Sequence, residues 1–321
     1  MTEEGSQMKK LSVVIPAYNE EKMVPKTAKT VSGLLKAHQI PYELIFVNDG
    51  SKDGTWQEIE KAVSTYPGIT GVQFSRNFGK ESAILAGLAA ATGDCCAVMD
   101  CDLQHPPETL LEMYRLWSEE GYEIVEGVKH SRGKESALHK ASAGMFYKIM
   151  TKAVGIDMSR ASDFKLMDKK AVEALLVMPE RNTFFRALSS WIGYRTTSVE
   201  FDVQEREEGE SKWSTWSLIK YALRNIIGFS TAPMQMVTVA GVLVLCMGII
   251  LGIQSLYKYF RGQALEGFTT VILLLLIIGS IIMISLGIIG CYISKIYEEV
   301  KGRPRYLVSR KIVSTVPENE K

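Results

Sequence analysis

The sequence predicts an α/β domain with a mostly parallel sheet, followed by two helices that cross a membrane. Two observations support this class. As far as about Lys220, short apolar runs alternate with polar or amphipathic segments, an order typical of parallel βαβ units. After Pro233, two long apolar runs contain no charged residue, and each exceeds the roughly 20 residues that a spanning helix needs.

Five short apolar runs are expected to form the first strands of the sheet, because each ends at turn residues or at a polar side chain. They are Leu11–Ile15, Glu43–Val47, Gly71–Phe74, Cys95–Met99 and Glu123–Gly127. Helices are expected between them, over residues 20–38, from Ser51 or Asp53 to Lys61, over Gly79–Ala91 and over Pro107–Glu119.

The next part of the chain carries weaker signals of the same kind. Residues 136–154 have helical spacing, and Asp163–Met167 is expected to form a strand or the end of one. A helix over Asn182–Trp191 and an alternating strand over Thr196–Val203 follow. Residues 205–212 are expected to form a charged loop that contains glycine.

Composition excludes several classes of function. The chain has 37 Lys and Arg against 36 Asp and Glu, so no bulk positive charge points to nucleic acid as a partner. Its five cysteines include no C-x-x-C pair, which argues against a zinc site or a disulfide framework. The sequence also lacks G-x-G-x-x-G after its first strand and a P-loop motif, so dinucleotide redox and P-loop phosphoryl chemistry are disfavoured.

Two carboxylates, Asp100 and Asp102, follow the fourth apolar run with one residue between them. Side chains at i and i+2 of an extended chain point to the same side, so both can reach one ligand. Mg²⁺ takes carboxylate oxygens and commonly shares its site with substrate phosphates, so one interpretation is a metal that holds a pyrophosphate. The other is an Asp-rich turn that caps the helix begun by Pro106 and Pro107.

The positions of other polar residues favour a site. Asp49, Arg76 and Lys129 also follow predicted strands, as Asp100 does. The carboxyl ends of parallel strands share one edge of the sheet, and α/β proteins bind ligands there. We therefore expect these side chains to meet on one rim.

The apolar runs over Met234–Leu256 and Phe268–Ile293 predict a membrane hairpin. Trp213–Phe229 mixes aromatic and basic residues, as interfacial helices do, and the basic segment after Ile293 places that end in the cytoplasm. The N-terminal residues lack a signal peptide's apolar core, so both termini are expected to be cytoplasmic. The expected domains are 1–212 (catalytic), 213–232 (interfacial), 233–294 (hairpin) and 295–321 (basic tail); a buried hairpin in a soluble protein is the alternative.

Four motifs in a fixed order then carry a family resemblance. They are Val14-Ile-Pro-Ala-Tyr-Asn-Glu20, Val47-Asn-Asp-Gly-Ser-Lys-Asp-Gly-Thr55, Ser75-Arg-Asn-Phe-Gly-Lys80 and Met99-Asp-Cys-Asp-Leu-Gln-His-Pro-Pro-Glu108. Followed by two spans, they resemble family 2 glycosyltransferases. More narrowly, they resemble polyprenyl-phosphate glycosyltransferases such as dolichol-phosphate mannose synthases and undecaprenyl-phosphate glucosyltransferases. The resemblance extends from Leu11 to about Arg310.

The resemblance implies a GT-A fold and an inverting, Mg²⁺- or Mn²⁺-dependent transfer of sugar from a nucleotide sugar to a polyprenyl phosphate at the cytoplasmic face. The nucleotide-binding residues it implies are Pro16, Tyr18, Glu20, Asp49, Lys80, Asp100 and Lys129. For the metal and diphosphate it implies Asp100, Asp102 and Gln104. For the acceptor phosphate it implies Arg132, Ser136, Arg206, Ser211 and Lys212. Its catalytic residues would be Asp163, in the place of a base, together with Asp102 and Arg206.

The sequence departs from the family pattern at a few positions. Asn48 stands where aspartate is more usual, and Lys129 and Lys165 stand where arginine is common. Lysine keeps the charge but loses the bidentate fork of a guanidinium. Arg186 is followed by Ala-Leu rather than Gly-Leu. None of these changes removes an implied metal ligand.

Several alternatives stay open. Asp163 is either a base or a positioning group, and His105 is expected to make a hydrogen bond at the start of a helix rather than to ligate metal. The donor is UDP-glucose or another UDP-hexose by analogy, with GDP-mannose as the alternative. A membrane scaffold that keeps the fold without activity is the competing class, and a homo-oligomer is one option. Processive synthases are disfavoured because the chain has no Gln-x-x-Arg-Trp motif.

Overall fold

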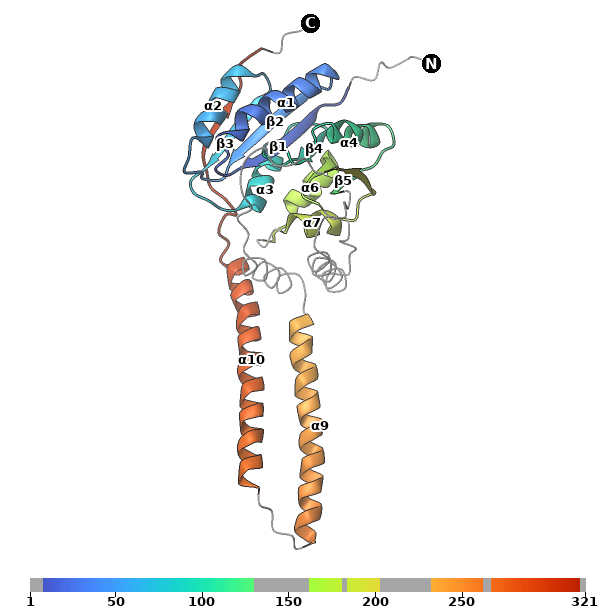
Figure 1. Ribbon diagram of the computed structural model, residues 1–321, viewed down its shortest axis with the longest axis vertical. Helices are drawn as coiled ribbons and strands as arrows, with labels where there is room; N and C mark the ends of the chain where they lie inside the picture. The colour runs from blue at the N-terminus through green and yellow to red at the C-terminus, as the bar shows by residue number, and fades with distance from the viewer. Residues whose placement is uncertain (1–7, 130–161, 181–183, 203–231, 262–266, 318–321) are drawn as a thin grey trace. The chain divides into compact units, whose positions relative to one another are not determined.

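The computed structural model describes residues 8–129, 162–180, 184–202, 232–261 and 267–317 (Figure 1). The described residues belong to two compact units. The first, which we call the catalytic unit, comprises those up to 202 and from 304 onward, and the second comprises residues 232–261 and 267–303. The two units are described separately below.

Eight strands in the described part of the chain form one sheet, in the order β7-β5-β6-β4-β1-β2-β3-β8. The strands are β1 Leu11–Ala17, β2 Tyr42–Asn48, β3 Ile69–Phe74, β4 Cys95–Val98, β5 Ile124–Lys129, β6 Lys165–Asp168, β7 Thr196–Phe201 and β8 Val308–Val313. Six of them run in the same direction, while β6 and β8 are antiparallel to their neighbours. The predicted α/β class with a mostly parallel sheet is confirmed.

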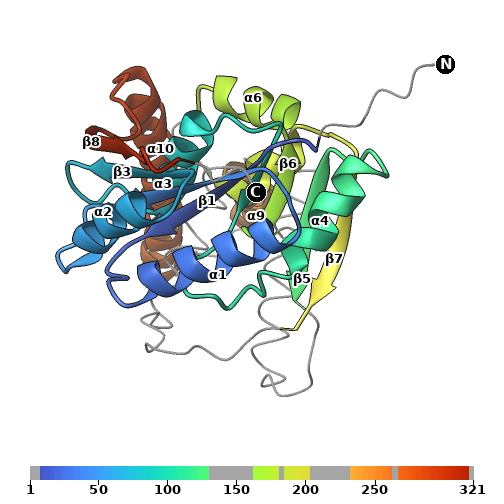
Figure 2. The same cartoon turned by 90° about the horizontal axis from the view of Figure 1, so that it is seen from above.

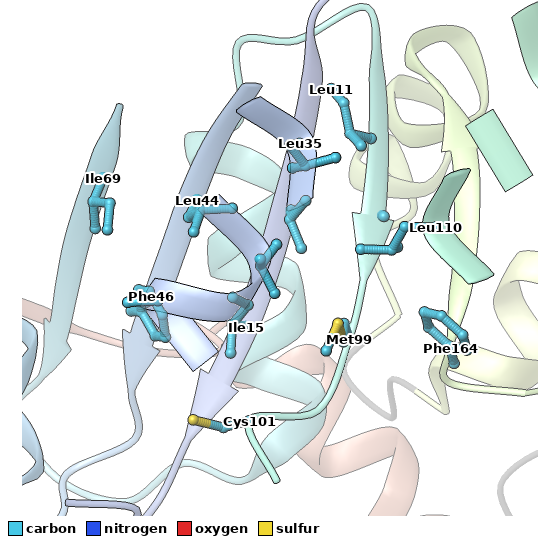
Figure 3. Packing of buried hydrophobic residues seen from close by; sticks show 14 of the residues in the cluster. Leu11, Ile15, Leu35, Leu44, Phe46, Ile69, Met99, Cys101, Leu110 and Phe164 are labelled. Atoms are coloured by element: carbon cyan, nitrogen blue, oxygen red, sulfur yellow. The ribbon is translucent and has the colours of Figure 1, made fainter. Parts of the chain in front are cut away.

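Helices cover both faces of this sheet (Figure 2). Those that pack on one face are α1 Met23–Ala37, α2 Thr55–Thr65 and α4 Thr109–Ser118, and those on the other are α3 Lys80–Ala90 and α6 Lys169–Val177, with α7 Phe185–Trp191 against α6. Figure 3 shows the main core, where Leu35 of α1 packs with Leu11 and Ile15 of β1. Because side chains alternate along a strand, Val14 of β1 points to the other face and lies against Gly87 of α3.

The central strand β1 is longer than its apolar run predicts, because it continues through Pro16 to Ala17. Pairing with β4 ends at Val14 opposite Val98, whereas pairing with β2 continues to Ala17 opposite Asn48. Pro16 therefore lies where β1 has a strand partner on one side only, which is where a sheet tolerates a residue without an N–H group.

Strand β8 has no counterpart in the sequence analysis, which treats residues 295–321 as a basic tail. It pairs with β3, and Thr70 faces Val313 at one end of the ladder. The residues directly before β8 also pack against the end of β3. The Leu307 carbonyl accepts from the Ser75 N–H at 3.0 Å, and the Tyr306 ring stacks on Phe74 with 5.0 Å between centroids.

The second unit contains two long helices, α9 Ala232–Phe260 and α10 Phe268–Val300. Both are long and apolar enough to cross a membrane, with mean hydropathy of 2.7 over Met234–Gln254 and 2.2 over Ile277–Val300. With 33 residues, α10 is about 50 Å long, more than the roughly 30 Å of a hydrocarbon core. It extends beyond the run predicted from the sequence and ends in a charged turn. Of the predicted interfacial segment over 213–232, residues 213–231 lie outside the described residues.

Candidate functional site

A pocket of about 300 Å³ opens at the carboxyl edge of the sheet, beyond the ends of β1, β2 and β4. It is lined by Pro16, Ala17, Tyr18, Glu20, Asp49, Asn77, Gly79, Lys80, Ala83, Asp100, Cys101 and Asp102. The structure thus brings together six of the seven residues assigned to the nucleotide from the sequence. The seventh, Lys129, is the exposed last residue of β5 and does not line this pocket. Arg76 also lies outside the lining, with its guanidinium 4.2 Å from the Phe78 ring centroid.

Asp49 shapes one wall of the pocket. Its two carboxylate oxygens accept hydrogen bonds from the backbone N–H groups of Phe78, at 2.6 Å, and Gly79, at 2.9 Å. Burial raises the pKa of Asp49 even though these two bonds favour the carboxylate. The adjacent Gly50 has φ +64°, and a Cβ there would overlap the backbone of Arg76, so glycine is required for this close approach.

The Asp100–Asp102 turn forms the floor. The side chain of Cys101 is buried in the core, and its carbonyl accepts from the Thr27 hydroxyl of α1 at 2.7 Å. This anchor leaves both flanking carboxylates lining the pocket. Asp102 Oδ1 also accepts from the Gln104 N–H at 3.1 Å, which closes a local turn. Helix α4 begins later, at Thr109, and has no capping side chain, so the helix-capping interpretation of this motif is wrong.

The pocket suits a hard divalent cation by the chemistry of its donors, because both side chains of the turn offer carboxylate oxygens. Asp100 already faces one positive charge, since Lys80 Nζ lies 2.7 and 2.9 Å from its two oxygens. Within the described residues, no three His, Cys, Asp or Glu side chains cluster as a complete metal site. A metal here would draw its remaining ligands from water and from a diphosphate, as Mg²⁺ commonly does.

A chain of charges connects this floor with the start of β6. Because Val98 faces Lys165 in an antiparallel ladder, the two residues beyond each bring Asp100 and Asp163 to the same edge. Lys80 Nζ lies 3.2 Å from Asp163 Oδ2, and so bridges the two carboxylates. Although burial opposes it, Asp100 and Asp163 raise the pKa of Lys80 well above its usual value, which keeps the ammonium charged.

Arg186 completes this group of charges. Its Nε lies 2.7 Å from Asp163 Oδ1, and its Nη2 lies 2.8 Å from Asp163 Oδ2, which makes a bidentate pair. Arg186 is carried by α7, whose first N–H, that of Phe185, donates to Glu81 Oε2 at 2.9 Å. Burial and, next, the charge of Asp163 raise the pKa of Glu81 to about 7.

A buried ion pair lies beside this group. Lys165 of β6 has a fully buried side chain, and its Nζ lies 2.8 Å from Glu126 Oε1 of β5 and 2.5 Å from Ser189 Oγ of α7. The other oxygen of Glu126 accepts from the Ser162 N–H at 3.0 Å, directly before Asp163. The Lys165 ammonium thus joins β6 to β5 and α7, and Glu126 joins the same pair to the loop before Asp163.

His105 has a supporting place in the structure. Its ring is buried and stacks on Phe164 with 4.6 Å between centroids, and Nδ1 lies 3.4 Å from the Asp100 backbone nitrogen. Burial lowers the pKa of His105, so the neutral imidazole can accept that N–H. The hydrogen bond therefore goes to the turn that carries Asp100 and not, as predicted, to the start of α4.

The residues assigned to the acceptor phosphate, Arg132, Ser136, Arg206, Ser211 and Lys212, lie outside the described residues. Sequence reasoning gave no role in the site to Glu81, Glu126 or Arg186. A partial signal existed, because Glu126 and Lys165 are charged residues inside otherwise apolar strands, and buried charges are normally paired. Their pairing follows only once β5 and β6 are known to be antiparallel.

Comparison with known proteins agrees with this geometry. A family model described as Glycosyl transferase family 2 matches residues 12–176. An uncharacterized glycosyltransferase of Bacillus subtilis, YkcC, is 37% identical over 301 residues, which are 93% of each chain. A prophage bactoprenol glucosyl transferase homolog of Escherichia coli is 36% identical, over 94% of this chain and 99% of the relative.

Among solved structures, glucosyl-3-phosphoglycerate synthase of Mycobacterium tuberculosis in complex with Mn²⁺ and UDP-glucose is similar, with a TM-score of 0.48 and 20% identity over 68% of this chain and 77% of that one. The mostly parallel sheet with helices on both faces is the GT-A arrangement that the sequence motifs imply. Because the family model covers half of the sequence and the relatives align along nearly all of it, the chain belongs to glycosyl transferase family 2 and is a glycosyltransferase.

Proposed function

We propose that this enzyme transfers a sugar from a nucleotide sugar to a polyprenyl phosphate at the cytoplasmic face of a membrane, with inversion at the anomeric carbon. One observation carries the proposal: a pocket lined by carboxylates and Lys80 belongs to the same chain as two helices apolar enough to cross a membrane. A relative that is 36% identical along 94% of this chain is named a bactoprenol glucosyl transferase homolog, which makes UDP-glucose the first donor to test.

The pocket offers groups for the nucleoside and for the diphosphate of the donor. Tyr18, Glu20 and Asp49 line the half formed by β1 and β2, where we assign the nucleoside. Asp100 and Asp102 would hold a divalent ion, which when bound stabilises the negative charge of the departing diphosphate. Lys80 is the one cationic side chain among the described pocket-lining residues, and we assign it to the same diphosphate.

The acceptor phosphate oxygen forms a bond to the anomeric carbon as the bond from that carbon to the nucleotide diphosphate breaks. From the resemblance, Arg132, Ser136, Arg206, Ser211 and Lys212 bind this phosphate. The membrane hairpin gives a reason for the tether, because the acceptor is confined to the bilayer and attachment raises the effective concentration of its headgroup. We place both termini on the cytoplasmic side.

The test is turnover by the full-length protein in membranes or detergent. Purified enzyme is incubated with undecaprenyl phosphate, Mg²⁺ or Mn²⁺, and separately UDP-glucose, UDP-N-acetylglucosamine and GDP-mannose, and the lipid products are weighed by mass spectrometry. A lipid heavier by one hexose is expected with UDP-glucose. Nucleotide release without a glycosylated lipid, from every donor, would contradict the proposal.

The metal assignment is tested in the same assay. Asp102→Asn is expected to reduce transfer to the background of a reaction with excess chelator, and to weaken Mn²⁺ binding in calorimetry without donor. Asp94→Asn is the matched control and should keep both properties, because Asp94 lies before the opposite end of β4, outside the pocket lining, and asparagine keeps an oxygen for the Lys10 N–H. Full turnover by Asp102→Asn, or by the wild type in excess chelator, would remove the metal from the proposal.

A further inference from the structure

The carboxylate of Asp163 is engaged on both of its oxygens. Oδ1 faces Arg186 Nε at 2.7 Å, while Oδ2 faces both Arg186 Nη2 at 2.8 Å and Lys80 Nζ at 3.2 Å. The side chain is only 14% exposed. An ionised carboxylate has about four lone-pair positions, so these three contacts leave little capacity to accept a proton.

The electrostatics agree with this geometry. Burial alone would raise the pKa of Asp163, but Lys80 and Arg186 hold it well below its usual range. A carboxylate so strongly stabilised as an anion is a weak base, because protonation would break a bidentate ion pair. A general base works best with a pKa near the operating pH.

The reaction of the proposed function, on which this inference rests, has little need of a base. A phosphate monoester loses its second proton with a pKa of about 6, so at pH 7.5 the acceptor is already mostly a dianion. Its oxygen can form the bond to the anomeric carbon without first giving up a proton. What the reaction requires is positive charge, fixed in place beside several phosphate groups.

We propose that Asp163 is a positioning residue that holds Lys80 and Arg186 as two adjacent cations at the edge of the donor pocket, and that Arg186 is a further cation of the active site. Lys80 lines the pocket, where the proposed function assigns it to the diphosphate. Arg186, whose side chain is 32% exposed, contacts Asp163 just before β6. It therefore extends the positive charge from Lys80 away from β1 and β2, where the nucleoside is assigned.

The contacts that hold helix α7, which carries Arg186, support this role. Helix α7 is held at its start by Glu81, which accepts the Phe185 N–H, and near its end by Lys165, which contacts Ser189. Arg186 lies between these two anchors. A solvated surface arginine needs no such support, whereas a side chain that must meet charge at a fixed point does.

Nucleotide binding gives the first test, because the two roles predict different effects of Asp163→Asn on nucleotide affinity. Calorimetry measures the binding of UDP with Mn²⁺ to full-length wild type, Asp163→Asn and Lys80→Met, without acceptor. Loss of a negative charge should by itself tighten the binding of an anion, and a base that acts only in the chemical step should leave it unchanged. Loss of positioning should weaken it three- to tenfold, in the direction of Lys80→Met. Wild-type or tighter affinity in folded Asp163→Asn would overturn the proposal.

The pH dependence of transfer gives the second test, with Arg186→Lys as the conservative variant. Asp163→Asn and Arg186→Lys should each lower kcat/KM by about ten- to a hundredfold. The double variant should fall no more than about threefold further, because both changes break one arrangement. All should keep the wild-type shape of the pH profile. An acid limb that vanishes in Asp163→Asn and moves to higher pH in Arg186→Lys would identify Asp163 as the proton acceptor.

Titratable groups around Asp163 must be separated in that profile. Lys80 and Glu81 face it from α3, Arg186 from α7, and Asp100 from the turn after β4. Glu81→Gln keeps an acceptor for the Phe185 N–H, so a limb near pH 7 that this variant removes belongs to Glu81. Thermal unfolding of each variant shows whether it is folded. If the wild type forms no glycosylated lipid, the proposed function fails while the calorimetric test still decides the role of Asp163.

Discussion

Lys165→Met should unfold the catalytic unit at a much lower temperature. The Lys165 side chain is fully buried, and its Nζ contacts Glu126 at 2.8 Å and Ser189 at 2.5 Å. Methionine fills similar volume, so the loss is one of charge and hydrogen bonds rather than packing. Removing one partner of a buried pair costs about 3–5 kcal/mol, because the remaining charge has no compensation. At about 2–4 °C per kcal/mol for a unit of this size, Tm should fall by about 6–20 °C.

Two controls isolate the cause of that loss. Lys61→Met breaks an ion pair of 2.6 Å with Glu58 whose lysine is 70% exposed, and such pairs contribute about 0–1 kcal/mol. The double variant Glu126→Gln/Lys165→Met removes both buried charges while leaving an amide oxygen for the Ser162 N–H, and should recover most of the lost Tm. Unfolding is followed by circular dichroism of the purified protein in detergent. The reasoning is refuted if Lys165→Met melts within 2 °C of wild type, or if the double variant melts no higher than the single one.

Three further outcomes are expected. Gly50→Ala should lower the free energy of unfolding by more than about 2 kcal/mol and weaken UDP binding in calorimetry. The reason is that a side chain there strains a φ of +64° and displaces the Arg76 backbone beside the pocket. Wild-type UDP affinity would contradict this. Glu81 has a folded pKa raised to about 7, so its contribution to stability is complete below its ordinary pKa of 4.5 and is lost as the pH rises toward 7. The Tm of Glu81→Gln should therefore match that of the wild type near pH 5 and exceed it by a few degrees at pH 8. A lower Tm than the wild type at pH 8 would show that the carboxylate is stabilising. A cysteine at Gln263 should react with an impermeant thiol reagent added outside intact cells, whereas labelling of a cysteine at Glu318 instead would reverse the proposed topology.

The strand–helix alternation was readable because its signals are local. Apolar runs such as Leu11–Ile15 and Cys95–Met99 end at turn residues, and each reappears as a strand whose bounds differ by a residue or two. Their shared direction also follows from chain order, since a helix between two strands returns the chain to the same edge. Six residues assigned to the nucleotide from the sequence consequently line one pocket.

The charge network could not be read in the same way, because its contacts join distant residues. Lys80 meets Asp163, 83 positions away, and Glu81 meets Phe185, 104 positions away. These pairs depend on β6 running antiparallel to β4, and the alternation of elements predicts the opposite direction. β8 was missed for another reason: Val308–Val313 is short and basic, and it lies in a segment assigned to a tail. Its residues do not alternate between apolar and polar, because Arg310 shares one face of the strand with Val308 and Ile312, so periodicity gave no strand signal there.

The return of the chain to the sheet as β8 also constrains the order of events during synthesis. The hydrogen bond from Ser314 to the Tyr66 carbonyl joins residues 248 positions apart, and both long apolar helices lie between them in the sequence. The ribosome must therefore deliver both helices before the edge of β3 can receive its last partner. Until then β3 is an open edge, the kind of surface at which nascent chains aggregate. A product truncated after Val300 would keep every pocket-lining residue and still lack β8, the strand that pairs with the edge of β3.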